Sequence, residues 1–358
     1  MVSRNSKLKT RNLKLETRNF KLETLNLFSG INNNKKMKGV KIFISFMAIG
    51  MVCLTAYLSV SSDDVERVMQ ERPMVLSMIA SPTVPMEITF CDELVDLRRY
   101  NMYEGMDREL SSFTYLHSTT MLLLKRANRY FPIIEPILKA NGIPDDFKYL
   151  AVIESNLDPR AVSPARAVGM WQFMEGTAKD HKLIITATVD ERYNVKRATE
   201  AVCIYLKTAY ARYGNWISVA ASFNAGMGRI STEMTRQRTD SALDLWVVEE
   251  TARYVYRIFA IKQIFENPYK YGFVLQPKDF YKPIECDEIT VSRNIPDLAV
   301  FAREHNITYA DLKRFNLWLK DTKLDVEGRS YTVFIPRESE LYYNTPNQFV
   351  HDPRWVVR

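Results

Sequence analysis

The chain has 358 residues, a formal net charge of +7 and a sequence pI near 9.0. Hydrophobic residues make up 46% of it and charged residues 25%, which excludes a wholly disordered or wholly membrane-embedded protein. The basic balance suits an anionic partner, but lysine and arginine do not gather into a nucleic-acid-binding module. We therefore expect no nucleic-acid partner.

The N-terminal part of the chain precedes any segment that can build a core. Residues 1–36 repeat Lys-Leu-Glu-Thr in a low-complexity run, which we interpret as a non-native extension. Met37 then opens a basic stretch that leads into an apolar run. This pattern predicts a signal peptide or a membrane anchor over 37–62, so the chain is exported, and an uncleaved segment would attach it to the membrane.

Two folded regions follow a linker or wrapping arm over 63–105, which carries three prolines and mixed charge. Apolar residues recur at helical spacing over 106–270, and no alternating strand pattern interrupts them, so this region is predicted to be an all-α domain. The helices expected within it lie at 122–130, at 133–140, from 145 onward, and at 198–213, 216–224 and 245–266.

The C-terminal region, 271–358, has a different character. A strand, two short helices and a closing strand are expected over about 289–336, which makes a small β-α-α-β unit. The overall prediction is therefore a mainly α protein with a small second domain. A unit of this size is too small to hold a large active site.

Neither cysteines nor histidines indicate a metal site or a cofactor. The four cysteines form no CxxC pair, and the four histidines are scattered along the chain. A disulfide between Cys91 and Cys286 is possible in an oxidising compartment, but the pattern favours separate thiols. We expect no metal, no cofactor and a monomeric chain.

Glu154 is the first candidate for chemistry. On the helix that opens near Asp145, Phe147, Leu150 and Glu154 share one face, so the carboxyl continues an apolar stripe. An apolar setting disfavours the charged form and raises the pKa of a carboxyl, which makes it a usable proton donor near neutrality. Taken alone, a solvated glutamate at a helix end remains the commoner explanation.

Two further segments carry side chains suited to sugars. Residues 167–174 combine glycine, a flat tryptophan and Gln172, whose amide both donates and accepts hydrogen bonds. Residues 220–226 place Asn224 after a run of small residues that allows close helix packing. Each segment alone is equally well explained by ordinary packing at a helix end.

Together, four ordered motifs resemble the soluble lytic transglycosylase (SLT, goose-lysozyme-like) domain, and in particular its membrane-bound murein transglycosylase D subgroup. The motifs begin at Glu154, Gly169, Phe223 and Glu250, and run over 154–163, 169–174, 223–226 and 250–255. The resemblance spans about 106–270 and implies a lysozyme-like α fold. It also implies cleavage of the β-1,4 bond between N-acetylmuramic acid and N-acetylglucosamine in peptidoglycan, in the periplasm of the cell envelope.

The resemblance also assigns roles residue by residue. Glu154 matches the single catalytic acid/base, and the sugar site is matched by Ser163, Gly169, Met170, Gln172, Phe223, Asn224 and Tyr254. Two positions depart from the family pattern. Phe223 stands where tyrosine is usual, so one hydroxyl is missing, and Arg166 stands where a small residue is common.

The family's reaction consumes no water and gives 1,6-anhydromuramyl ends. Ordinary glycosidases need two carboxylates, and Asp158, the nearest other acid in sequence, is expected to be structural in the turn that ends the helix. Three alternatives remain open: a lysozyme-type hydrolase, a peptidoglycan-binding protein without turnover, and a helical envelope domain with no sugar role.

The β-α-α-β unit resembles a degenerate LysM glycan-binding module. The similarity is carried by residues 295–298, 306–312, Asn316 and 331–336, whereas Arg293 and Asn294 replace the usual Gly-Asp-Thr opening. Binding of glycan and simple packing against the enzyme are both open for this unit.

Overall fold

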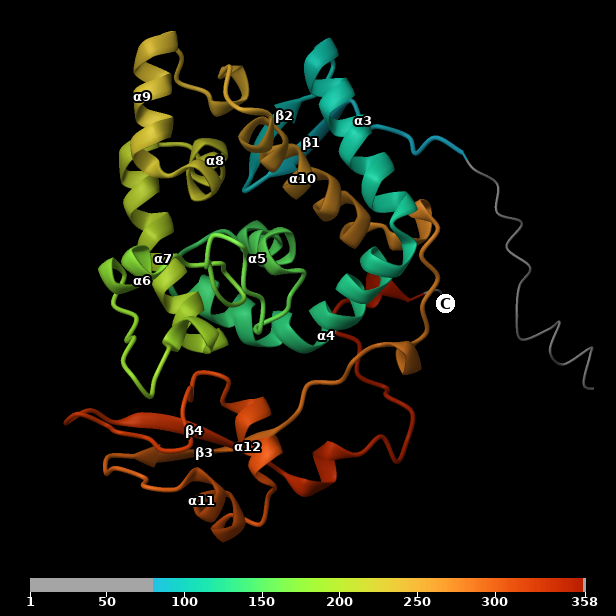
Figure 1. Ribbon diagram of the computed structural model, residues 1–358. Helices are drawn as coiled ribbons and strands as arrows, with labels where there is room; N and C mark the ends of the chain where they lie inside the picture. The colour runs from blue at the N-terminus through green and yellow to red at the C-terminus, as the bar shows by residue number, and fades with distance from the viewer. Residues whose placement is uncertain (1–79, 357–358) are drawn as a thin grey trace, which may run out of the picture. The chain divides into compact units, whose positions relative to one another are not determined.

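The computed structural model describes residues 80–356. The expectations for residues 1–36 and 37–62, and for the start of the arm, lie outside the described residues. The described helices and strands are shown in Figure 1 and follow in chain order as β1 Glu87–Phe90, β2 Glu93–Asp96, α3 Tyr100–Tyr115, α4 His117–Ala140, α5 Lys148–Ser155, α6 Glu175–Asp180, α7 Val195–Tyr213, α8 Trp216–Ala225, α9 Met227–Gln237, α10 Glu249–Glu266, β3 Cys286–Val291, α11 Leu298–Glu304, α12 Tyr309–Phe315 and β4 Tyr331–Pro336.

The helices from α3 to α10 pack around one hydrophobic core (Figure 1). Helix α10 contacts α3, α5 and α8, while α4 contacts α5 and α7. The short helix α5 is buried along almost its whole length because apolar residues occupy every side of it. The structure thus confirms the predicted mainly α fold.

Helix α4 differs from the expectation of two helices. Pro132 and Pro136 lie inside one continuous helix, although an interior proline removes a backbone hydrogen bond and costs ~3 kcal/mol. Phe131, Ile134 and Leu138 are fully buried on the same helix, and their packing holds it together through the prolines. Tertiary packing therefore overrides the local signal that suggested a break.

A hairpin occupies part of the segment expected to be a linker or wrapping arm. Strands β1 and β2 pair antiparallel, and their alternating side chains place Ile88, Phe90 and Val95 in the core of the helical domain. The backbone N–H of Cys91 in the turn donates to Asp146 Oδ2 at 2.7 Å, just before α5. This described part of the arm therefore packs as a component of the helical domain, and α3 begins earlier than expected.

The C-terminal unit has the predicted β-α-α-β order. Strands β3 and β4 pair antiparallel, with Cys286 opposite Pro336 and Val291 opposite Tyr331. Its small core also includes Val189, which belongs to the loop before α7. Because Lys320 N donates to Thr188 O at 2.9 Å, that loop fastens the unit to the helical domain.

Three cysteines of the described residues, Cys91, Cys203 and Cys286, are free thiols. The Cys91–Cys286 bridge is therefore not formed. Burial raises the pKa of the Cys203 and Cys286 thiols to about 11, so both stay protonated near neutrality.

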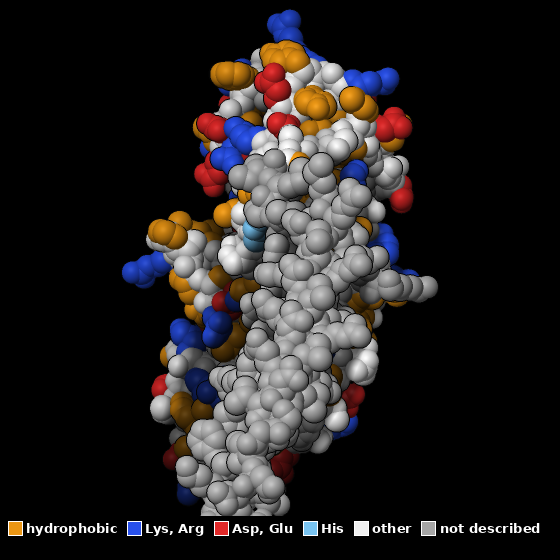
Figure 2. Space-filling view, turned by 90° about the vertical axis from the view of Figure 1, so that its right-hand side faces the viewer, with side chains coloured by type: hydrophobic (Ala, Val, Ile, Leu, Met, Phe, Trp, Pro, Cys, Tyr) orange, Lys and Arg blue, Asp and Glu red, His pale blue; other side chains and the backbone are white. Residues whose placement is uncertain are grey.

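The surface charge is mixed. On the face in Figure 2, acidic and basic side chains are interspersed over the coloured part of the surface, and neither sign gathers into a single patch. Over residues 80–356, none of the helices combines the length and the apolar character needed to cross a bilayer.

Candidate active site

Helix α5 brings Glu154 to the rim of the core. The helix ends at Ser155 because Asn156 and Leu157 both adopt left-handed backbone conformations, with φ of 55° and 54°. Leu157 is fully buried and fixes this turn. The last turn of α5 therefore leaves the Glu154 side chain half-buried instead of extending it into solvent.

The Glu154 carboxyl meets a neutral partner. Tyr254, which is 3% exposed on α10, donates its hydroxyl to Glu154 Oε1 at 2.6 Å. Burial raises the pKa of Glu154 from 4.5 to about 7, against the opposing effects of the Tyr254 hydrogen bond and the Arg257 charge. A large fraction of the carboxyl is therefore protonated at neutral pH, as a general acid requires.

The loop between α5 and α6 folds back on itself. Ser163 Oγ accepts a hydrogen bond from Ala167 N at 2.9 Å, and the Gln172 side-chain amide donates to Gly169 O at 2.9 Å and to Ala161 O at 3.2 Å. The Gln172 amide nitrogen therefore shapes the loop, which differs from a purely sugar-facing role.

Gly169 and Met170 fix the backbone of this loop. The φ of Gly169 is +82°, and a Cβ there would lie 2.0 Å from Arg192 O, so only glycine fits. Met170 is 1% exposed and its sulfur accepts from the Ser155 hydroxyl at 3.7 Å, directly beside Glu154 in the chain. Both residues hold the backbone in place and do not present side chains at the surface.

Helix α8 supplies the last predicted pair. Asn224 Oδ1 accepts from Thr251 Oγ1 at 3.1 Å, one turn before Tyr254 on α10. The half-buried Phe223 packs edge-to-face on Tyr205, with ring centroids 5.3 Å apart. The structure thus brings Glu154 and Tyr254 together directly and places Asn224 against the same helix.

Sequence reasoning missed one contributor. The Tyr205 hydroxyl donates to Ser222 O at 2.6 Å, which fixes the end of α8 beside Phe223. For Trp171, a flat face for a sugar and ordinary packing were both open; its indole N–H donates to Thr199 Oγ1 at 2.9 Å and the ring is fully buried, so it anchors the loop.

A second carboxylate paired with Glu154 is not found among the described residues. Asp158 is bonded to Arg160, with its Oδ1 accepting from the Arg160 backbone N–H at 2.9 Å, as expected for a structural acid. Glu250, exposed on the first turn of α10, is the acid whose charge reaches Glu154. Residues 80–356 contain no cluster of His, Cys, Asp or Glu that could hold a metal ion.

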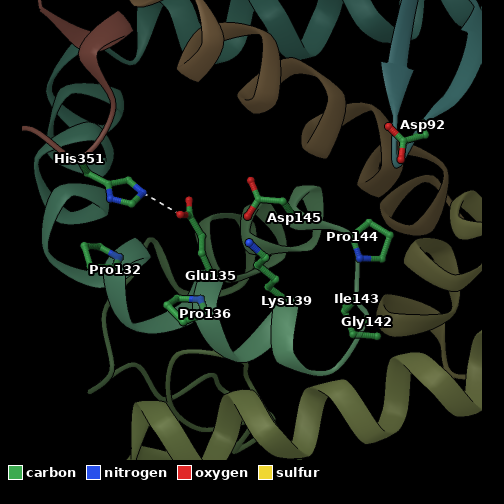
Figure 3. Close-up of a pocket in the computed structure, with 10 residues that line it drawn as sticks. All are labelled: Asp92, Pro132, Glu135, Pro136, Lys139, Gly142, Ile143, Pro144, Asp145 and His351. Atoms are coloured by element: carbon green, nitrogen blue, oxygen red, sulfur yellow. Dashed lines mark hydrogen bonds and ion pairs between the residues drawn. The ribbon is translucent and has the colours of Figure 1, made fainter.

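A spacious cavity lies away from Glu154, beside the C-terminal tail. It measures about 760 Å³, and Figure 3 shows Glu135, Asp145, Lys139 and His351 on its walls. Glu135 is already engaged there: it is hydrogen-bonded to His351 Nε2 at 2.8 Å and accepts from Lys148 Nζ at 2.7 Å. The bond to His351 ties the C-terminal tail to α4 at this cavity.

Two family models match the chain. Residues 131–245 match the transglycosylase SLT domain, and residues 287–339 match the soluble lytic transglycosylase C-terminal LysM-like domain. The chain therefore carries an SLT-type match followed by a LysM-like match.

Among known proteins, the chain is similar to the membrane-bound lytic murein transglycosylase D of Escherichia coli K12, with 28% identity over 240 residues. The match covers 66% of this chain and 51% of that relative, so the chain spans about half of the relative's length. It is also similar to solved structures of the lytic transglycosylase Slt from Pseudomonas aeruginosa (22% identity, 38% of this chain and 24% of that chain, TM-score 0.33) and of the 70 kDa soluble lytic transglycosylase from Escherichia coli (23% identity, 40% and 24%, TM-score 0.33).

Proposed function

We propose that this chain, which carries an SLT transglycosylase domain and is homologous to lytic murein transglycosylase D, is itself a peptidoglycan lytic transglycosylase. The observation that carries the proposal is the Glu154–Tyr254 pair. It supplies one carboxyl whose pKa is raised to about 7, so that a substantial fraction of it is protonated near neutrality, and that carboxyl is held by a neutral phenol on a buried helix. A single acid that keeps its proton fits a reaction in which the substrate provides the nucleophile.

The reaction begins with proton transfer. Protonated Glu154 gives its proton to the oxygen that links muramic acid to the next sugar, and the C1–O bond breaks as the muramyl N-acetyl group stabilises C1. Glu154, now a carboxylate, takes the proton of the muramyl C6 hydroxyl while that oxygen bonds to C1. The products are a 1,6-anhydromuramyl end and a free 4-hydroxyl, and the catalyst returns to its starting form.

The remaining site residues position the sugar. Asn224 has an amide nitrogen suited to a sugar carbonyl, while its oxygen is held by Thr251. Ser163 and Gln172 set the shape of the loop that follows α5, and Phe223 adds an apolar wall without the usual hydroxyl. Tyr254 is a positioning residue that fixes the catalytic carboxyl.

The substrate class also sets the place of action. Peptidoglycan strands lie outside the cytoplasmic membrane, so we place the enzyme in the cell envelope, in the periplasm. Membrane attachment would come from residues 37–62 if that segment is retained, and the enzyme works as a monomer. The LysM-like unit joins the catalytic domain through the loop at Thr188.

Digestion of peptidoglycan in water enriched in ¹⁸O tests the reaction. A lytic transglycosylase gives anhydro products that are one water lighter than reducing ends and carry no ¹⁸O. A hydrolase gives reducing ends that contain ¹⁸O, and Glu250 would then be the first candidate for the base that activates water. Glycan binding without any released fragment would indicate a binding protein and contradict the proposal.

A further inference from the structure

A second cavity lies between the helical domain and the C-terminal unit. It has a volume of about 440 Å³, within the range of small-ligand sites. Tyr130 and Ile133 of α4 form one wall, and Ile284, Leu317 and Phe334 of the C-terminal region form the opposite wall. The lining is mainly apolar and aromatic, which favours a ligand that has apolar groups of its own.

Beside this cavity, the loop that leads into α7 is bonded directly to the C-terminal unit. Asp190 N donates to Trp318 O at 2.9 Å, Lys320 N donates to Thr188 O at 2.9 Å, and Val189 pairs with Leu319 as a β-bridge. These bonds hold the loop, whose continuation Tyr193–Lys196 lines the cavity, against the C-terminal unit without help from a ligand. The cavity is therefore pre-formed, which reduces the entropy cost of binding.

Arg129 gives the cavity its charge. The other two cations on its walls are neutralised, because Lys196 bonds to Glu288 and Arg314 bonds to Asp311. Arg129 instead contacts neutral groups: its Nε donates to Lys282 O at 3.0 Å, and its guanidinium lies 5.4 Å from the centre of the Tyr281 ring. Its Nη2 also donates to the neutral Tyr343 hydroxyl at 3.3 Å, and among the described residues no carboxylate lies within ion-pair distance of it, so a carboxylate of a ligand can form a charge-assisted bond there.

A neutral sugar fits this lining less well. The cavity wall has one amide, Asn194, and its oxygen already accepts from Arg197 N at 3.2 Å as a helix cap. The carboxylate of Glu288 is held by Lys196. Apart from tyrosine hydroxyls, few groups remain that could bond the hydroxyls of a sugar ring.

The cavity also reaches the turn that ends the catalytic helix. Pro159 lines the cavity and follows Asp158 in that turn, where Arg126 donates to Asn156 O at 2.8 Å. Helix α4, which carries Arg126 and Arg129, therefore borders both the Glu154 turn and the cavity. A ligand in the cavity and a glycan at Glu154 would be held by the same helix and turn.

From these contacts we propose that the interdomain cavity binds an acidic, partly apolar peptide, namely the peptide stem of peptidoglycan. Such stems combine alanine methyl groups with free carboxylates, which match the apolar walls and Arg129. The inference rests on the proposed function for the identity of the peptide. It makes the cavity a determinant of selectivity for strands that still carry their stems.

The test uses the full chain, two variants that alter the cavity in different ways, and two control variants. Arg129→Gln removes the charge, and Ile133→Trp fills the apolar space; Arg129→Lys restores charge, and Arg303→Gln removes an exposed arginine of α11 outside the cavity. The binding probe is the free stem tetrapeptide, L-alanyl-γ-D-glutamyl-meso-diaminopimelyl-D-alanine, measured by calorimetry. The kinetic probe is the ratio of kcat/KM on strands with stems to kcat/KM on strands stripped by an amidase.

We expect Arg129→Gln and Ile133→Trp each to weaken tetrapeptide binding and to lower the kcat/KM ratio by about tenfold. Arg129→Lys recovers part of both, and Arg303→Gln retains both. Tetrapeptide binding that is absent in the wild type, or equal loss on both kinds of strand, would overturn the inference.

The two proposals can fail separately. If the wild type cuts neither kind of strand but binds the tetrapeptide in an Arg129-dependent manner, the proposed function falls and the cavity assignment stands. If it cuts both kinds and does not bind the peptide, the cavity assignment falls and the function stands.

Discussion

Glu154 and Glu135 are half-buried glutamates on neighbouring helices, and their surroundings differ in one decisive way. Glu154 is bonded to the neutral phenol of Tyr254, and burial raises its pKa to about 7. Glu135 is also partly desolvated, but hydrogen bonds from His351 and Lys148 hold its pKa below the ordinary value. Figure 3 shows the bond to His351. The charge of the partner, and not burial alone, therefore separates a proton donor from a structural anion.

The backbone around the two acids differs as well. Glu135 lies within the long helix α4, whereas the segment after Glu154 contains four non-glycine residues with positive φ: Asn156, Leu157, Arg166 and Gln172. Such conformations cost about 1–3 kcal/mol each and persist where the surroundings enforce them. The concentration of strain beside Glu154 fits a site shaped for a ligand.

The largest expected effect is a loss of glycan turnover at one of the two acids and not at the other. Glu154→Gln should lower turnover of glycan strands by roughly 10²–10⁴-fold, because the amide has no proton to transfer. Glu135→Gln is the matched control, since it makes the same chemical change in a structural ion pair, and its turnover should stay within a few-fold of wild type. Initial rates on purified strands measure both; a comparable loss in the two variants would show that the effect is one of folding.

The backbone strain of the loop can be tested by the same substitution at two glycines, one in the loop and one outside it. Gly169→Ala should destabilise the protein by roughly 2–4 kcal/mol, since a Cβ there meets the Arg192 carbonyl and φ is +82°. Gly176→Ala provides the control because nothing lies within 4 Å of its Cβ position. Urea denaturation gives both values, and an equally small change at Gly169 would mean that the loop relaxes freely.

Stability should respond to pH in opposite directions at the two acids. Because the unfolded chain ionises Glu154 near pH 4.5 and the folded protein only near 7, the protein loses stability as the pH rises from about 4.5 to about 7, and the loss is complete above that. Glu154→Gln should therefore stabilise the protein at pH 8.5 by about 1–3 kcal/mol and give no gain at pH 4. Glu135 contributes stability above pH 4.5 that is lost as the pH falls through its lowered pKa. Glu135→Gln should therefore cost about 1 kcal/mol at pH 7 and less in acid.

Thermal unfolding across this pH range measures both effects. A gain from Glu154→Gln that is the same at pH 4 and pH 8.5 would contradict the raised pKa.

The smallest expected effect concerns the phenol. Tyr254→Phe should lower kcat by about tenfold through looser positioning of the carboxyl. Its hydrogen bond lowers the pKa of Glu154, so its removal should also move the alkaline fall in kcat/KM to higher pH. An unchanged pH profile with a lower rate would make Tyr254 a packing residue only.

Local signals in the sequence were sufficient for several features. The apolar spacing placed Glu154 at a helix end and predicted separate helices over 198–213 and 216–224. In the structure Gly214, with φ of +70°, ends the first of these helices, and the Asn215 side chain accepts from Ser218 N at the start of the next. The β-α-α-β order of the C-terminal unit followed from the same kind of pattern.

Long-range contacts were beyond those signals. The bond from Tyr254 to Glu154 joins α10 to α5, and Asn128 of α4 donates to Tyr281 O and Phe349 O of the C-terminal region. Neither contact leaves a periodic pattern, because each depends on how distant elements pack. For the same reason, the sequence did not predict that the Gln172 side-chain amide would donate a hydrogen bond within its own loop.

Carboxyl titration by NMR tests the central claim most directly. In protein with ¹³C-labelled glutamate carboxyls, the Glu154→Gln and Glu135→Gln variants identify the two signals by their loss. We predict that Glu154 titrates near pH 7 and Glu135 below 4.5. A Glu154 signal that titrates at or below 4.5 would contradict its role as the proton donor at neutral pH.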